Sequence, residues 1–204
     1  MKLRNFLFGL FFVMVSMLDF ESDLDEYQKL EIKNVSSIRR EDLPSDFSDE
    51  AFKTVDEFIR KTRDLNYEFV IYFDYVTGEI LKCVKGGKDA VSFDFEDGEF
   101  EGYLVASIHN HPEDVYSPPS GKNFGILVRN FEDCELIASV NELWILKVKG
   151  FHINLLFEFK FMAELFLKAS FDDAKLKYDD WNEINDKCEE EYGYQLSKYI
   201  MIKT

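Results

Sequence analysis

Two of the three histidines in this 204-residue chain lie one residue apart, in the segment His109-Asn110-His111-Pro112. The segment ends an apolar stretch typical of a β-strand, and side chains alternate between the two faces of a strand. Both imidazoles are therefore expected to point to the same side, with Pro112 ending the hydrogen-bonded ladder. Two imidazoles on one face suit zinc or another borderline divalent metal. An H-x-H pair also occurs by chance on protein surfaces, so the pair alone is a weak indication of a metal site.

The residues after the histidines extend the pattern. Seven residues separate Pro112 from Ser120, and two more precede Asn123, which gives H-x-H-P-x(7)-S-x(2)-N. This resembles the signature of the JAMM/MPN metalloprotease family, H-x-H-P-x(7)-S-x(2)-D, with every spacing intact. The resemblance covers residues 48–149 and is closest to the prokaryotic and phage-type branch, whose loops read Ile-His-Asn-His-Pro.

The resemblance implies a zinc site and a role for each matching residue. His109 and His111 would be zinc ligands, with Asn123 at the position of the third ligand. Ser120 would stabilise an oxyanion, and Glu68, which opens an expected strand after the first helix, would be the general base. The implied reaction is hydrolysis of peptide or isopeptide amides, so the implied partner is a protein or peptide substrate, ubiquitin-like tails included.

Asn123 departs from the family pattern, which has aspartate at this position. It lies three residues after Ser120, one helical turn on and on the same side, so the geometry is preserved. A neutral amide oxygen is a poorer zinc ligand than a carboxylate. Two alternatives stay open: a weaker working site completed by Asn123, Glu113 or Asp114, or a catalytically inactive JAMM-like scaffold that binds a protein partner. On sequence alone, Asn123→Asp is expected to raise zinc affinity.

The elements that must position these residues alternate between helices and strands. Ser48 is a plausible N-cap for an amphipathic helix that ends near Asn66, and Thr77-Gly78 is expected to turn a hairpin. The expected strands are 68–74, 79–84, 90–95, a central 103–108, 135–140 and 143–149; the expected helices are 48–66, 120–130 and most of the chain after 150, with 172–204 mostly helical.

This order predicts an α/β (α+β) fold. We expect a JAMM/MPN-like curved mixed β-sheet flanked by helices, with a C-terminal helical extension. The predicted division is an N-terminal apolar helix and acidic connector (1–46), the JAMM/MPN-like domain (47–150) and the extension (151–204).

Composition narrows the function classes further. The chain has 24 Lys and Arg against 40 Asp and Glu, a formal net charge of −16, and its few basic pairs are diluted by acids. Nucleic-acid binding needs clustered basic residues, so no nucleic-acid partner is expected. The three cysteines, Cys83, Cys134 and Cys188, include no C-x-x-C pair, which argues against a thiolate zinc finger and for a reducing compartment.

The N-terminus allows more than one interpretation. Lys2 and Arg4 precede an apolar run from Phe6 to Leu18, shorter than the roughly 20 residues that a spanning helix needs. We expect a cytoplasmic protein whose first helix packs on the domain or on another chain. Export or membrane anchoring through residues 1–18 is the alternative, since basic residues before an apolar run resemble a signal peptide. A homo- or hetero-oligomer stays open, because the apolar ends exceed what one small domain easily covers.

Overall fold

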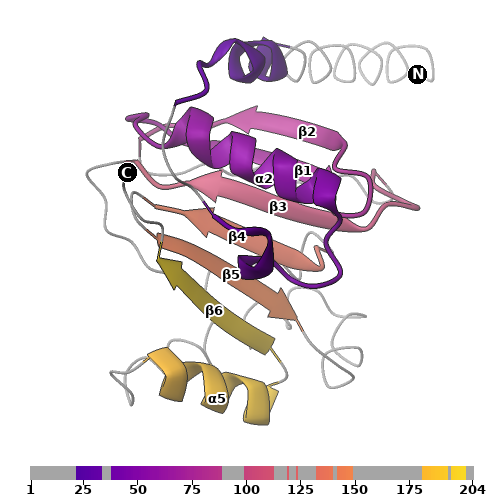
Figure 1. The fold of residues 1–204 in the computed structure, drawn as a ribbon, viewed down its shortest axis with the longest axis vertical. Coiled ribbons are helices and arrows are strands. Elements are labelled where there is room, and N and C mark those ends of the chain that lie inside the picture. The colour runs from indigo at the N-terminus through magenta and orange to yellow at the C-terminus, as the bar shows by residue number, and fades with distance from the viewer. Residues whose placement is uncertain are drawn as a thin grey trace, which may run out of the picture.

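The computed structural model describes residues 22–33, 38–88, 99–112, 119, 123, 132–139, 142–148, 181–192 and 194–200. These residues form a mixed α+β fold, a sheet flanked by helices (Figure 1). The strands are β1 (Phe69–Asp74), β2 (Ile80–Lys85), β3 (Val105–Asn110), β4 (Cys134–Ala138), β5 (Glu142–Val148) and β6 (Tyr194–Ile200). The helices are η1 (Arg40–Asp42), α2 (Asp49–Thr62) and α5 (Trp181–Tyr192), and residues 22–29 are also helical.

The six strands lie in the order β2-β1-β3-β4-β5-β6. All neighbours are antiparallel except β3 and β4, which run parallel with Ala106 opposite Cys134 and Asn110 opposite Ala138. The strand that carries the histidines therefore lies inside the sheet, between β1 and β4. The prediction of a central strand before His109 is confirmed.

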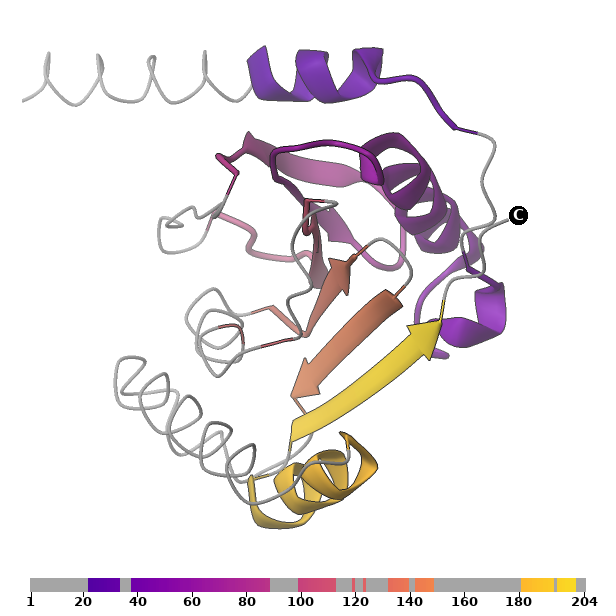
Figure 2. The ribbon, with the colours of Figure 1, turned by 90° about the vertical axis from the view of Figure 1, so that its left-hand side faces the viewer.

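Helix α2 forms where the sequence predicts it. The Ser48 hydroxyl accepts a 2.9 Å hydrogen bond from the N–H of Ala51, and Asp49 and Glu50 in the first turn favour the helix dipole. The helix ends at Thr62, four residues before the predicted Asn66. It lies on one side of the sheet, as Figure 2 shows edge-on.

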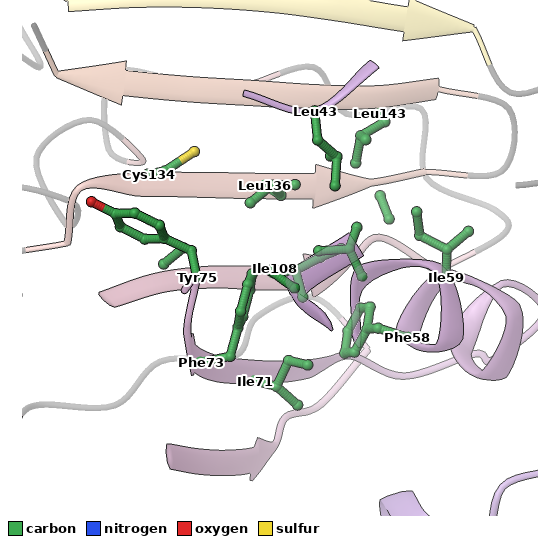
Figure 3. Close-up of a cluster of buried hydrophobic side chains, with 14 of the residues drawn as sticks. Leu43, Phe58, Ile59, Ile71, Phe73, Tyr75, Ile108, Cys134, Leu136 and Leu143 are labelled. Carbon is green, nitrogen blue, oxygen red and sulfur yellow. The ribbon is translucent and has the colours of Figure 1, made fainter. Parts of the chain in front are cut away.

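The main hydrophobic core fills the space between α2 and this sheet face (Figure 3). Phe58 and Ile59 of α2 meet alternate residues of the strands, among them Ile71, Ile108 and Leu136. Burying a side chain of this size stabilises the fold by about 1.5–3 kcal/mol. The segment before α2 also contributes, because Tyr27 stacks on Phe58 with ring centroids 5.8 Å apart.

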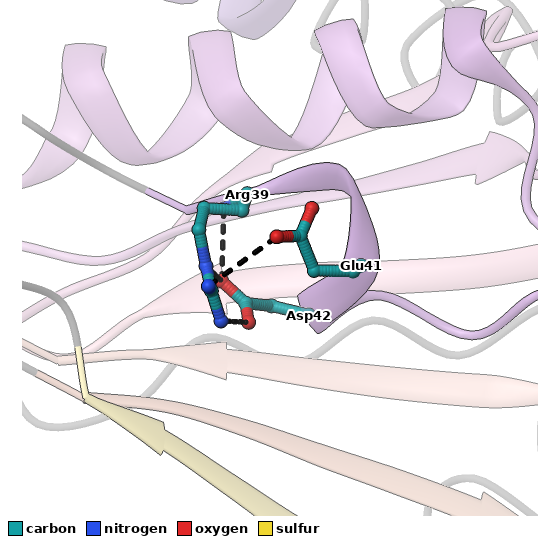
Figure 4. Close-up of polar contacts among 3 residues, drawn as sticks. All are labelled: Arg39, Glu41 and Asp42. Carbon is teal, nitrogen blue, oxygen red and sulfur yellow. Dashed lines mark hydrogen bonds and ion pairs between the residues drawn. The ribbon is translucent and has the colours of Figure 1, made fainter.

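Helix η1 leads the chain into α2. Figure 4 shows Arg39 holding this turn through two acidic neighbours. Its backbone N–H donates to Asp42 Oδ2 at 2.8 Å, its guanidinium donates to Asp42 Oδ1 at 2.8 Å, and Glu41 lies 3.3 Å from the guanidinium. Arg39 is exposed, so these contacts shape the turn more than they stabilise the domain.

The opposite sheet face carries the polar residues of interest. Because side chains alternate along a strand, core residues Phe69, Ile71 and Ile108 leave Val70, Ser107 and His109 on the far side. In the parallel pair of β3 and β4, registered residues share a face, so Glu135, opposite Ser107, lies there too.

Several predicted elements are confirmed, and one is wrong. The predicted hairpin around Thr77-Gly78 is present as the antiparallel pair β1–β2. The predicted hairpin of strands 135–140 and 143–149 is present as the antiparallel pair β4–β5. The chain after residue 172 was expected to be mostly helical, and α5 agrees with this, but residues 194–200 form β6. This strand pairs with β5 over seven residues, a long-range contact that overrides the local pattern.

Other predictions fall on residues outside the described ranges: the apolar N-terminal helix at 1–18, the strand at 90–95 and most of the helix at 120–130, of which Asn123 is helical. Among the described residues, no helix is long and apolar enough to cross a membrane.

Candidate metal centre

The end of β3 supplies both histidines. His109 is the penultimate residue of the strand, and His111 keeps the extended path because its N–H donates to the carbonyl of Ala138 at 2.8 Å. The two imidazoles thus project from the same sheet face, as the H-x-H spacing predicts. Only 7% of His109 is exposed, whereas His111 is half-buried, so the pair is reached from the His111 side.

The imidazoles face each other through their Nε2 atoms, which lie 3.2 Å apart. Two nitrogen ligands on a tetrahedral zinc ion lie about 3.3 Å apart when each Zn–N distance is about 2.0–2.1 Å. The ring planes are tilted by 57°, with centroids 5.0 Å apart. This separation is that of a hydrogen bond between the two rings, and it is also close to the spacing of two nitrogen ligands on one zinc ion.

Behind His109 lies a carboxylate that sequence reasoning missed. Glu135 Oε1 is 3.3 Å from His109 Nδ1, on the ring edge away from His111. An acidic acceptor at Nδ1 favours the tautomer with its proton there, which leaves the Nε2 lone pair for a metal. Glu135 could be identified only from the parallel pairing of β3 with β4, and no local sequence pattern indicates that pairing.

Asn123 joins the same carboxylate. Its amide nitrogen donates to Glu135 Oε1 at 3.2 Å, so Glu135 contacts both the imidazole of His109 and the residue at the predicted third-ligand position. The other end of the Asn123 amide is a carbonyl oxygen, an acceptable if weak ligand for a divalent ion. Glu135 thus contacts two of the residues expected to be metal ligands, His109 and Asn123, while His111 contacts His109.

The electrostatics of this cluster keep the histidine neutral. Burial and the neighbouring His111 lower the pKa of His109 well below 6.5. Burial, followed by repulsion from Glu132, raises the pKa of Glu135 well above 4.5, although the hydrogen bond from Asn123 acts in the opposite direction. A neutral imidazole is the form that binds a metal.

Glu68 lies on the same sheet face. It extends the β1–β2 ladder by one residue, since its N–H donates to Gly87 at 2.9 Å and its carbonyl accepts from Gly86 at 2.8 Å. Val70 pairs directly with His109, so alternation puts Glu68 on the histidine face, one pair further along and next to His111. Glu68 is only 7% exposed.

Asn110, between the two histidines, fixes the backbone on both sides of Glu68. Its Oδ1 accepts from the N–H of Phe69 at 2.7 Å, and its Nδ2 donates to the carbonyl of Tyr67 at 3.0 Å. The side chain is buried, so each of these bonds satisfies a backbone group that water does not reach easily. The sequence alone does not identify these two hydrogen bonds, because they join residues 41 and 43 positions apart.

Ser120, together with Glu113 and Asp114, lies outside the described residues. Among the residues that the structure does describe, no three His, Cys, Asp or Glu side chains form a complete ligand set. The two imidazoles face each other, and Glu135 contacts both His109 and the Asn123 amide. This set fits zinc in the Nε2 separation and in the acid that orients one ligand, and it lacks a charged third ligand.

Comparison with known proteins adds no relative: no protein-family model matches the sequence, and neither a curated protein nor a solved structure does.

Proposed function

We propose that this protein is a zinc-dependent hydrolase of peptide or isopeptide amide bonds, of the JAMM type. The observation that carries the proposal is the 3.2 Å separation of the His109 and His111 Nε2 atoms, with Asn123 gathered at the same cluster. The position of Glu68 on the same sheet face supports it further. His109, His111 and Asn123 would hold the ion.

Zinc, when bound, supplies Lewis-acid polarisation of the carbonyl and lowers the pKa of a water molecule to about 7. The chain's own residues handle the protons and the charge. Glu68 accepts the proton of the attacking water and delivers it to the leaving amine, so one buried carboxylate serves as base and then as acid. Ser120 would donate to the developing oxyanion, which is typically worth about 3 kcal/mol of transition-state stabilisation.

The second candidate is a metal-free scaffold of the same architecture that binds a protein partner. The neutral Asn123 favours this alternative, because it removes one negative charge from the ligand set. The strongly acidic chain, with its net charge of −16, would then suit a neutral or basic partner.

Metal content separates the two candidates. Protein purified without chelator is expected to contain about one zinc ion per chain, and His109→Ala and His111→Ala are each expected to lose it. His152→Ala is the matched control, because the third histidine lies outside the H-x-H-P pattern. Less than about 0.1 zinc per chain, with no uptake on adding zinc, would end the enzyme proposal in favour of the scaffold.

Activity provides the second measurement. The zinc-loaded protein should cleave members of a mixed pool of peptides and lysine-linked isopeptides, detected by mass spectrometry, and chelation should stop the cleavage. Full zinc occupancy without cleavage of any amide in the pool would contradict the proposed reaction while leaving the metal site in place.

A further inference from the structure

We propose that Glu135 is the positioning residue of this metal centre: one buried carboxyl group orients both His109 and Asn123. The inference rests on the proposed zinc site. It assigns Glu135 a role that the H-x-H-P-x(7)-S-x(2)-N pattern does not contain.

The first step is the shared contact. Glu135 Oε1 lies 3.3 Å from His109 Nδ1 and 3.2 Å from Asn123 Nδ2, so one oxygen atom faces both groups. Each contact involves the end of the side chain that is opposite to its metal-binding atom. His109 turns its Nε2 toward His111, and an amide that donates its N–H to a carboxylate has a more polarised carbonyl oxygen.

The second step is burial. Glu135 is 4% exposed and is the second residue of β4, with Ser107 and Leu146 as its registered neighbours. Its Oε2 atom has no hydrogen-bond partner among the described residues. Burial therefore keeps this carboxyl group against His109 and Asn123, the two side chains that it contacts.

The third step concerns the zinc affinity of Asn123→Asp, for which the structure and the sequence alone predict different results. On sequence alone, restoring the family's aspartate is expected to strengthen zinc binding. In the structure, an aspartate at position 123 would place a second carboxylate against Glu135, where the Asn123 amide now donates. Like charges in direct contact disfavour each other, so Asn123→Asp alone gains nothing. The change becomes favourable only when Glu135 is neutralised.

The test compares zinc affinities by competition with a chromophoric chelator, using the full-length protein. Glu135→Leu is expected to weaken zinc binding about 10–100-fold, the usual effect of removing a group that orients a metal ligand. Glu135→Gln keeps the shape but replaces one acceptor oxygen with an amide, so it also weakens binding, and its melting curve shows whether the fold is intact. Glu132→Gln is the matched control: it removes a neighbouring buried acid that contacts Ser107 and is expected not to lower affinity.

The double variant tests the charge argument. Asn123→Asp is expected to bind zinc no more tightly than the wild type, whereas Asn123→Asp combined with Glu135→Gln is expected to bind more tightly than either single variant. If Asn123→Asp alone binds more tightly than the wild type, Glu135 does not hold residue 123 through this contact and the inference is overturned.

A readout without metal checks the orientation directly. In nitrogen-15 spectra of the metal-free protein, His109 is expected to carry its proton on Nδ1, and Glu135→Leu is expected to shift it toward a tautomer mixture. A wild type that takes up no zinc overturns the proposed function and this inference together. A wild type that binds zinc while Glu135→Leu binds it equally well, with His109 unchanged, overturns only the role of Glu135.

Discussion

At the scale of single residues, the candidate centre depends on a few side chains whose roles differ. His109 and His111 face each other, Glu135 backs His109, and Asn110 fixes the chain around Glu68. The histidines follow from the H-x-H-P spacing in a strand, so their common face was predictable. The contacts of Glu135 and Asn110 were not, because they depend on strand pairings that no local pattern indicates.

Glu68→Gln separates proton transfer from metal binding. The substitution keeps the shape of the side chain and removes the base, so the hydrolysis rate is expected to fall about 10²–10⁴-fold. Zinc content should not change, because Glu68 is not among the proposed ligands. Glu101→Gln, an exposed acid, is the control that should leave the rate as it is. Retained hydrolysis by Glu68→Gln would assign the base to another group.

Asn110→Leu tests the two hydrogen bonds that the Asn110 side chain makes to the backbone next to Glu68. Leucine cannot pair with the N–H of Phe69 or the carbonyl of Tyr67, and leaving a buried polar group unpaired costs about 1–3 kcal/mol. The free energy of unfolding, measured in denaturant, should fall by about that amount, and any hydrolysis rate should fall too, since Glu68 loses its fixed position. An equally stable Asn110→Leu variant would show that the two side-chain hydrogen bonds of Asn110 are dispensable.

At the scale of elements, the β1–β2 turn joins the sheet to α2. Gly78 has φ +75°, and a Cβ there would lie 2.7 Å from the carbonyl carbon of Glu50 in the first turn of α2. Gly102 also has a positive φ, of +92°, but a Cβ would meet open space. The two glycines therefore differ in packing while sharing a backbone conformation that disfavours other residues.

Gly78→Ala and Gly102→Ala form a matched pair. The left-handed conformation alone costs an alanine about 1–2 kcal/mol, so Gly102→Ala should lower the free energy of unfolding by roughly that amount. Gly78→Ala should lower it further, because its Cβ meets helix backbone. Thermal or denaturant unfolding measures both, and equal losses would mean that α2 moves aside without cost.

Asp74 holds the same turn and makes it sensitive to acid. Its Oδ1 accepts from the N–H groups of Val76 and Thr77, both at 2.8 Å, and its Oδ2 accepts from Leu104 at 3.3 Å. Burial acts to raise the pKa of Asp74, but these backbone donors outweigh it and lower the pKa below 3.8. The folded state therefore favours the ionised carboxylate.

Asp74→Asn is expected to lower stability at neutral pH by about 1.5–3 kcal/mol, since it weakens hydrogen bonds to a charged group. A depressed pKa contributes stability above the unfolded value, near 3.8, and loses it as the pH falls through the folded value. The difference between wild type and variant should thus shrink below pH 4. A difference that stays constant down to pH 2 would rule out the charge of Asp74 as its source.

At the scale of the whole molecule, the sheet was predictable in part. The β-branched and aromatic run before the Thr77-Gly78 turn indicated β1, the return segment after the turn indicated β2, and the apolar run before His109 indicated β3. Strand β6 was missed because Gln195, Ser197 and Lys198 give it a mixed character, and its pairing with β5 is decided by tertiary contacts. Local sequence patterns therefore predict β1, β2 and β3, whereas β6 depends on its pairing with β5 in the folded sheet.

Two cysteine side chains are buried in the main hydrophobic core. Cys83 and Cys134 are free and buried, and burial raises the pKa of Cys83 to about 12. In the native protein at pH 8, both are expected to resist iodoacetamide for as long as the fold persists, because the thiolate is the reactive form. Mass spectrometry of native and denatured samples measures this. Rapid labelling of Cys83 without denaturant would mean that β2 opens readily.

The parallel pairing of β3 and β4 has a consequence for how the centre is gathered. His109 and Glu135 lie on these two strands, and His111 and Asn123 fall between them in the sequence. Bringing together groups so near in the chain carries a small loop-closure entropy cost. The whole set could therefore be transplanted as a single cassette into another parallel strand pair, with Glu68 as the one component left to be added.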